Sequence, residues 1–287
     1  MKKFIFNLSV FFIIALVFNI VVFVFANDNY YKGYKDFPSK SYHTFIIADS
    51  HGLSIDRFAE AYQVYNFSAS SDSYLDMKRK VTYLIENGYK ADTIYLTVDR
   101  HTLSPYRDQF NNTDKSIIYT SEMNFSYIKE KYFKYYLPIF QSKVNPLFRI
   151  YLEDKAKLIY LGKNKIPNNM IWNQLAEEEK FKRSRERVSG QFPTQENSER
   201  LENTLLEIIN LCKKNNIELI GLKFPLSGSY LKMLKNRNYG ADSLFYSHGL
   251  KVLDYESLFI GNEQYFKDED HLNFDGGKEF AKTLLSK

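Results

Sequence analysis

The chain has 287 residues, enough for one domain of roughly 250 residues and an anchor segment. Hydrophobic residues make up 44% of it, which suffices for a large core, and the net charge is only +5. Without a long basic stripe or a nucleic-acid motif, this composition argues against nucleic acid as a partner. The single cysteine, Cys212, excludes an intramolecular disulfide and lies on an apolar helix face, which predicts a buried thiol.

The N-terminus carries the first predicted element. Residues 4–26 are apolar apart from Asn7, Ser9 and Asn19. A helix of about 20 apolar residues spans the hydrocarbon core of a bilayer. Lys2 and Lys3 precede this run, which favours a cytoplasmic N-terminus and an exported domain. We prefer an uncleaved single-pass anchor over residues 1–27, with a signal peptide cleaved after Ala26 as the alternative. Both place the remaining chain outside the cytoplasm, and the anchor places it at the cell membrane.

Residues 28–40 are polar and aromatic and are expected to form a juxtamembrane linker before one domain over residues 41–287. The expected strands are Phe45–Ala48, Gln63–Phe67, Thr93–Val98, Ile217–Lys223 and Lys251–Asp254. The expected helices are Ser54–Tyr62, Tyr74–Asn87, Asn197–Asn215 and 276–285. Strands separated by helices predict a five-stranded parallel sheet with helices on both faces. The predicted fold class is α/β, a flavodoxin-like three-layer sandwich preceded by one transmembrane helix.

A long insertion, at about residues 104–196, separates the third and fourth predicted strands. It is rich in Tyr, Phe, Lys and Glu, and its pattern is mostly helical. The charged run Ala176–Arg187 is expected to be a solvated helix face, with contact to a partner or substrate as the alternative. The chain contains 23 Tyr and 24 Phe, which we expect in core and half-exposed sites or, alternatively, in a sugar-binding groove.

Two segments far apart in the chain carry the residue types of a serine hydrolase. Ala48-Asp49-Ser50-His51 ends the first predicted strand, and Asp268-Glu269-Asp270-His271-Leu272-Asn273 precedes the last helix. A serine hydroxyl needs a base to take its proton and a carboxylate to orient that base. Ser50, His271 and Asp268 supply these groups, with Asp270 as the alternative to Asp268. In a parallel sheet, catalytic groups gather at the carboxyl ends of the strands, where both segments are expected.

These two segments resemble the first and last blocks of the SGNH (GDSL-like) hydrolase superfamily, and the resemblance covers roughly residues 41–287. In that family the nucleophilic serine stands in a Gly-Asp-Ser segment after the first strand, and the base stands in a late Asp-x-x-His segment. Here Ala48 replaces the glycine, and Asp268-x-x-His271 matches the late block. The resemblance implies an SGNH-like fold and a triad of Ser50, His271 and Asp268.

Two middle blocks of the family match less well. In Asn66–Asp72, Ser71 stands where the family has its oxyanion-hole glycine, and Leu96–His101 contains no counterpart of the family's asparagine. The resemblance implies backbone N–H donors from Ser50 and from Ser70 or Ser71. We expect Arg100 or His101 to substitute for the asparagine, with an ion pair between Arg100 and an acidic side chain as the alternative. Asp49 is expected to bond its own loop and His51 to be structural, while His43 and His248 have no ligand-like neighbours. We therefore expect no metal site and no cofactor.

A membrane-tethered, exported domain of this kind resembles the SGNH proteins that work beside polytopic membrane-bound O-acyltransferases. Those families acetylate exopolysaccharides or D-alanylate teichoic acids. The resemblance implies an O-acyltransferase or acyl-esterase that acts on a cell-surface glycan through an acyl-serine, with such a polytopic protein as its partner. The missing middle-block residues support an alternative, a non-catalytic surface or assembly protein. A secreted carboxylic ester hydrolase is a further alternative, against which the apolar anchor counts.

Overall fold

The computed structural model describes residues 1–121, 123–161 and 172–286, with side chains from 157 to 161 left undescribed. The chain forms two compact units. Met1–Phe37 and Ser121–Asn168 form the N-terminal unit, and Pro38–Thr120 and Asn169–Lys287 form the sheet unit. The expected insertion 104–196 contributes to both units, and its residues 122 and 162–171 lie outside the described ranges.

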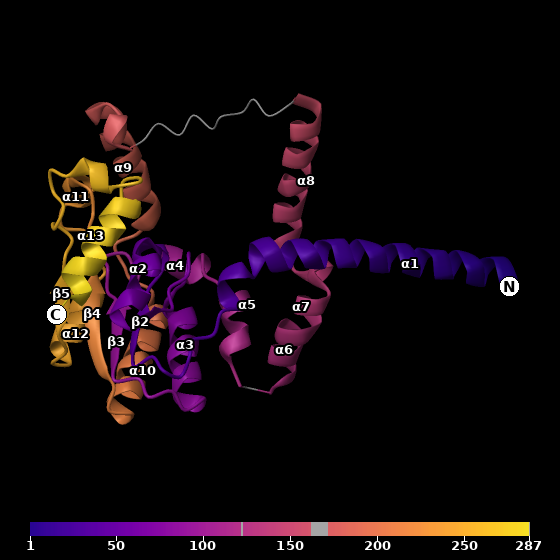
Figure 1. The fold of residues 1–287 in the computed structure, drawn as a ribbon, viewed down its shortest axis with the longest axis horizontal. Coiled ribbons are helices and arrows are strands. Elements are labelled where there is room, and N and C mark those ends of the chain that lie inside the picture. Colours follow the sequence, from indigo (N-terminus) through magenta and orange to yellow (C-terminus); the bar gives the residue numbers. More distant parts are fainter. Residues whose placement is uncertain (122, 162–171, 287) are drawn as a thin grey trace. The chain divides into compact units, whose positions relative to one another are not determined.

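A five-stranded sheet organises the sheet unit (Figure 1). Its strands are β1 Thr44–Ile47, β2 Val64–Asn66, β3 Thr93–Thr97, β4 Glu218–Lys223 and β5 Val252–Asp254. Their order is β2-β1-β3-β4-β5, and every neighbouring pair is parallel. The predicted α/β fold class is therefore confirmed. In this order β2 lies on one side of β1, while β3, β4 and β5 lie on the other. The strand order therefore reverses at β1, and the carboxyl end of β1 lies at a topological switch point.

Helices connect the strands of the sheet unit. They are α2 Asp56–Ala59, α3 Tyr74–Glu86, α4 Pro105–Gln109, α5 Thr113–Ser116, α9 Glu177–Gln191, α10 Glu199–Lys214, α11 Gly228–Leu234, α12 Ala241–Ser247 and α13 Phe274–Leu285. One prediction differs from the structure: the expected helix Ser54–Tyr62 is replaced by a 3-10 helix, Ser50–Ile55, then α2 and a 3-10 turn, Glu60–Tyr62. The Asp49 side chain accepts the N–H of His51, so helical turns begin four residues early.

The core of the sheet unit lies on both faces of the sheet. Every side chain from Phe45 to Ala48 is fully buried, so β1 is covered on both sides. Helices α3 and α10 pack against each other, while α13 packs against α2 and the 3-10 helix Ser50–Ile55. Cys212 lies buried on α10, which confirms the predicted core thiol. The 3-10 helix Ser50–Ile55 is called the Ser50 helix. Because α13 packs against it, the two sequence motifs come together.

The N-terminal unit is built around one long helix. Its helices are α1 Lys2–Phe25, α6 Phe125–Ile128, α7 Lys134–Tyr136 and α8 Val144–Leu161, and a π-helical turn Ala26–Tyr30 extends α1. Among the described residues, this N-terminal helix is the one that is long and apolar enough to cross a membrane, a property that signal sequences share. Val22, Phe25, Val144 and Phe148 belong to its small buried core.

Candidate active site

Ser50 stands where β1 turns into a 3-10 helix. The turn is tight because Asn66 donates its side-chain amide to the Gly52 carbonyl at 2.7 Å. A Cβ on Gly52 would lie 2.2 Å from Oγ of Ser68, so only glycine fits there. Ser68 in turn accepts the N–H of Ala48 at 3.0 Å. These contacts present Ser50 at the carboxyl edge of the sheet.

His271 lies against Ser50, although the two residues come from opposite ends of the domain. Nε2 of His271 is 2.8 Å from Oγ of Ser50, and Nδ1 is 2.8 Å from Oδ1 of Asp268. The same Asp268 oxygen also accepts the backbone N–H of His271 at 2.9 Å, which fixes the loop that precedes α13. The three residues expected from the sequence thus form a chain of contacts from the Ser50 hydroxyl through the His271 imidazole to the Asp268 carboxylate, as a catalytic triad requires.

Asp270, the alternative carboxylate, faces the same nitrogen of His271. Its Oδ1 lies 3.0 Å from Nδ1, and its Oδ2 accepts from Nε of Arg187 at 2.8 Å and from Nε2 of Gln191 at 3.0 Å. The Asp270 side chain is 1% exposed, compared with 34% for Asp268. Arg187 and Gln191 come from α9, so the solvated face expected for the charged run carries at least one inward-facing cation.

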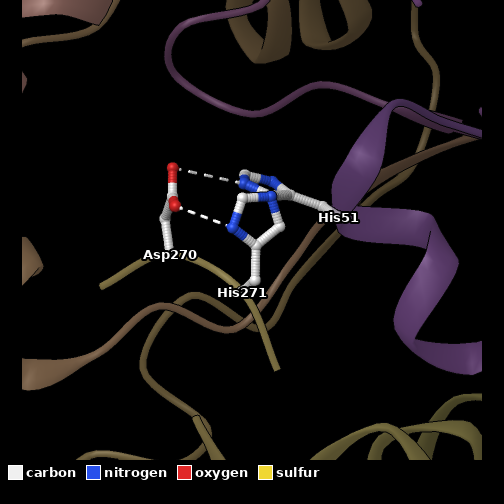
Figure 2. Close-up of side chains that lie close together, drawn as sticks. All are labelled: His51, Asp270 and His271. Atoms are coloured by element: carbon white, nitrogen blue, oxygen red, sulfur yellow. Dashed lines mark ion pairs between the residues drawn. The ribbon is translucent and has the colours of Figure 1, made fainter. Parts of the chain in front are cut away.

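His51 is a second imidazole beside His271, and the two rings meet edge to face at an interplanar angle of 73°. Its Nδ1 lies 2.6 Å from Oδ2 of Asp99, and its Nε2 lies 3.6 Å from Oδ2 of Asp270. The rings of His51 and His271 are 5.0 Å apart between centroids. Figure 2 shows Asp270 facing both rings at once. The sequence suggested only a structural role for His51, because its contacts with Asp99 and Asp270 depend on tertiary structure.

The charge on His271 is controlled by its two carboxylates. Burial alone lowers its pKa, but the contacts with Asp268 and Asp270 outweigh burial and raise the pKa to about 9. The charge of His51 acts in the opposite direction. A base accepts a proton only in its neutral form, so His271 can activate Ser50 more readily as the pH rises toward that value.

Asp270 and His51 stabilise each other's charges. Burial disfavours ionised Asp270, yet His271, His51 and Arg187 hold its pKa well below the usual range. Burial also disfavours charged His51, yet Asp49, Asp99 and Asp270 raise its pKa well above the usual range. The carboxylate of Asp270 therefore remains an acceptor at neutral pH.

Two groups of side chains in the described part of the chain have donor types found in metal sites. They are His51 with Asp270 and His271, and Asp49 with His51 and Asp99. Arg187 already places a cation on Asp270, and Asp99 lies at hydrogen-bonding distance from His51. This arrangement favours protons shared among protein groups over a metal ion.

The loop after β2 provides a candidate oxyanion donor. Ser71 has a φ of +68°, the left-handed conformation that a glycine adopts more easily. In the described chain, the backbone N–H groups of Ser50 and Ser71 have no hydrogen-bond acceptor. Asn112 bonds the Ser70 carbonyl at 2.6 Å, and Lys80 bonds Asp72 at 2.6 Å. These anchors hold the loop in shape despite the missing glycine.

His101 and Arg100 lie in different surroundings. His101 lines the cavity beside Ser50 and contacts Asp49 through Nε2 at 3.3 Å. Arg100 does not line that cavity: its Nε lies 2.9 Å from both carboxylate oxygens of Glu256, and its Nη1 donates to the Lys235 carbonyl. The acidic pairing weighed as the alternative is thus present, and Arg100 is not placed as an oxyanion donor.

A cavity of about 450 Å³ opens over Ser50. It is lined by residues from five segments of the sheet unit: Asp49, Ser50, Leu53, Ser54, Ser70, Ser71, His101, Tyr106, Arg107, Arg187, Gln191, Lys267, Asp268, His271 and Leu272. Most of these side chains are polar, and they include three cations. The volume falls within the range of small-ligand sites.

Comparison with known proteins identifies no family for this chain. No protein-family model matches the chain, and no curated protein matches it. A GDSL-like lipase from Bacteroides thetaiotaomicron VPI-5482 has 10% identity and a TM-score of 0.40, covering 90% of this chain and 95% of the other. A candidate acylhydrolase from Bacteroides fragilis NCTC 9343 has 10% identity and a TM-score of 0.38, covering 90% and 92%. These values are too low to assign an activity.

Proposed function

We propose that the chain is a serine-dependent O-acyltransferase or acyl-esterase that acts on a cell-surface glycan through an acyl-serine. The observation that carries this proposal is the position of His271, with Nε2 at 2.8 Å from Ser50 Oγ and Nδ1 at 2.8 Å from Asp268. A histidine that only capped a surface loop would not need contacts with a serine hydroxyl on one ring nitrogen and a carboxylate on the other. The arrangement has the parts that acyl transfer requires.

The reaction follows from these positions. Neutral His271 takes the Ser50 proton as Oγ attacks the acyl carbonyl, and Asp268 stabilises the imidazolium that forms. The N–H groups of Ser50 and Ser71 donate to the developing oxyanion. His271 then returns the proton to the departing alcohol, which leaves an ester on Ser50. A second hydroxyl, from a sugar or from water, attacks this ester with His271 again as the base.

The cavity and the N-terminal helix support a glycan as the acceptor. Polar side chains around Ser50 suit a hydroxyl-rich ligand better than a long acyl chain. An apolar helix at residues 2–30 would confine the active site near a membrane, where a polytopic acyltransferase would supply acyl groups. Such confinement replaces a bimolecular encounter with a high effective concentration. These features favour transfer over hydrolysis by a diffusing enzyme.

Two measurements test this function. A fluorophosphonate probe should label the full chain in detergent and spare Ser50→Ala, while Ser247→Ala, which changes an exposed serine on α12, should be labelled like the wild type. Equal labelling of wild type and Ser50→Ala would exclude Ser50 as the nucleophile. In cells, Ser50→Ala and gene deletion should each lower the ester-linked acyl groups of purified surface polysaccharide. A rise would identify an esterase, and no change would contradict any catalytic role on this glycan.

A further inference from the structure

The exposed surface of the N-terminal unit is unusually apolar. Of the residues in α1, only Asn19, Val22 and Phe25 are buried, and its aliphatic and aromatic side chains from Phe4 to Val17 are exposed. Single exposed apolar residues are common, but a contiguous apolar surface of this size marks an interaction site. A bilayer accounts for it on α1. The helices packed on α1 have apolar surfaces of their own.

The helical segment 125–136 is amphipathic. Its exposed large side chains recur at helical spacing, and they are Phe125, Ile128, Tyr132, Phe133 and Tyr136. Lys129, Glu130, Lys131 and Lys134 occupy the intervening positions, and Lys134 pairs with Glu130. The apolar residues also line a cavity of about 590 Å³, which is distinct from the cavity at Ser50.

Helix α8 also exposes apolar side chains. Leu147, Ile150, Tyr151 and Leu152 are exposed, while Phe148 turns inward against α1. Phe140, in the turn between α7 and α8, is 57% exposed. We call residues 125–152 the platform.

The platform is fixed to one end of α1. Nδ2 of Asn19 donates to the Tyr136 carbonyl at 3.0 Å. The Phe148 ring lies 6.0 Å from that of Phe18 and 5.1 Å from that of Phe25. Figure 1 shows α8 running across α1 rather than along it. The platform is thus attached near residues 18–25, and the first part of α1 projects away from it.

These attachment points set the depth of the platform in a membrane. At about 1.5 Å per residue, Phe18 lies about 21 Å along the helix from Phe4, and Phe25 lies about 32 Å from it. The hydrocarbon core is about 30 Å thick. If Phe4 begins the span, then Phe25 lies at the far boundary between acyl chains and headgroups, and Phe18 lies about 9 Å inside it. Helices that cross α1 there lie in the plane of that boundary.

We propose that the platform is an interfacial membrane-binding surface, with lipid acyl chains and headgroups as its occupant. Lipid is favoured over a partner protein because the platform packs directly on α1, whose own exposed side chains suit a bilayer. Tyr132, Tyr136 and Tyr151 suit the headgroup level, where aromatic rings with a polar tip accumulate. In this orientation the lysines of the segment 125–136, including Lys129 at the apolar cavity, would extend their long side chains to the headgroups and water, as amphipathic side chains do at interfaces. This proposal does not depend on Ser50 chemistry.

Tryptophan fluorescence in lipid nanodiscs tests it. The chain has one tryptophan, Trp172, which is 1% exposed inside the sheet unit and gives a shielded baseline. Phe133→Trp and Phe140→Trp each add one reporter on the platform, and Tyr246→Trp adds a matched exposed reporter on α12 of the sheet unit. In nanodiscs of brominated phosphatidylcholine, the added emission of both platform variants should fall at least about twofold relative to unbrominated lipid, because the rings lie at the acyl boundary.

The control Tyr246→Trp should lose no emission. Unquenched platform reporters with water-like emission maxima would overturn the proposal and would leave a protein partner as the occupant. A second readout uses the unaltered chain in the same nanodiscs. A lipid-phase carbene probe should label peptides within 125–152 and spare the peptide 241–247, whereas equal or absent labelling of both would contradict lipid contact.

Discussion

Nδ1 of His271 has two carboxylates within reach, and their surroundings differ. Asp268 bonds it at 2.8 Å and is partly solvated, while Asp270 lies 3.0 Å away, is almost fully buried and is held by Arg187. The Asp268 carboxylate also accepts the backbone N–H groups of Asp270 and His271, so its own loop holds it in place, whereas Asp270 is held by Arg187 of α9. The site therefore contains two anchored acceptors for the same proton, one partly solvated and one buried.

We expect the two carboxylates to be partly redundant. Asp268→Asn and Asp270→Asn should each slow phosphonate labelling about tenfold, and the double variant should approach the rate of Ser50→Ala because the imidazole then lacks any anionic partner. Asp270→Asn should also lower the free energy of unfolding by about 1–3 kcal/mol, since Arg187 loses its counter-charge. Labelling rates and thermal melts measure both effects. A single Asp268→Asn as slow as Ser50→Ala would show that Asp270 does not substitute.

The pH dependence of labelling should reveal the charge of His51. The charged and titratable groups that face it are Asp49, Asp99, His101, Asp270 and His271; Arg187 and Asp268 contact Asp270 and His271 in turn. Labelling by the wild type should rise with pH through about 9, where His271 loses its proton. His51→Gln removes a positive charge from beside that ring, so the pKa of His271 should rise and the acidic limb should move up by about one pH unit or more.

At pH values below the pKa of His271, His51→Gln should therefore be labelled about tenfold more slowly than the wild type. Well above that pKa, the two rates should be equal. His248→Gln, which changes an exposed ring on the C-terminal end of α12, should leave the profile unmoved. A limb that stays in place or moves down in His51→Gln would show that His51 carries no charge next to His271.

Ser50, Asp268 and His271 could be predicted from the sequence because each is marked by residues that are its neighbours along the chain. Ser50 ends a buried strand, and Asp268 and His271 are separated by one turn. The roles of Arg187, Asp99 and His51 could not be predicted, since each depends on a contact between segments far apart in the chain. Ser71 is an intermediate case: its position was expected from the resemblance, but its left-handed φ, which keeps the donor in place, required the structure.

At the scale of elements, the approach of α13 to the Ser50 helix positions the base. A Cβ on Gly277 would lie 2.0 Å from the Ser54 carbonyl oxygen, and one on Gly276 would lie 2.2 Å from the Tyr265 carbonyl oxygen. Both obstacles are backbone atoms, which cannot move without shifting a whole segment. Because Gly276 and Gly277 have no side chains, α13 can pack closely enough for His271 to contact Ser50.

Gly277→Ala should push α13 away from the 3-10 helix Ser50–Ile55. We expect a loss of about 1–3 kcal/mol in the free energy of unfolding, as for other overpacked sites, and labelling slower by up to about a hundredfold because a shift near 1 Å misplaces the base. Thermal unfolding and labelling rate check the two effects. Gly190→Ala, in α9, meets no atom within 4 Å and should be neutral or slightly stabilising. Wild-type labelling in Gly277→Ala would mean that α13 can retreat without moving His271.

Strand positions followed from hydrophobic runs because a buried parallel strand is apolar on both faces. The segment after Ser50 was harder to predict, since Asp49 bonds the N–H of His51 and starts a 3-10 helix before the apolar periodicity begins. Such side-chain capping is weakly encoded in hydrophobic patterns.

At the scale of the whole molecule, the N-terminal helix is part of a folded unit. Val22 and Phe25 are buried with Val144 and Phe148, and Ala26 is helical and buried. We expect mass spectrometry of the mature protein to find the N-terminal segment attached, because cleavage after Ala26 would remove Val22 and Phe25 from that core. An N-terminus at Asn27 would contradict this and would indicate a soluble exported domain. Hydropathy alone could not decide the question, since anchors and signal peptides share an apolar run.

The division of each unit between separate stretches of chain has a consequence for the time course of synthesis. Helix α1 is made first, but Val144 and Phe148 follow it by about 120 residues, which takes roughly 6–24 s at about 5–20 residues per second. Likewise β4 completes its pairing with β3 only after the chain has advanced from Thr97 to Glu218. Until then, unpaired strands and an unfilled core remain exposed to other nascent chains. We expect this protein to depend on chaperones until its synthesis is complete and to fold slowly afterwards, since long-range pairing delays folding.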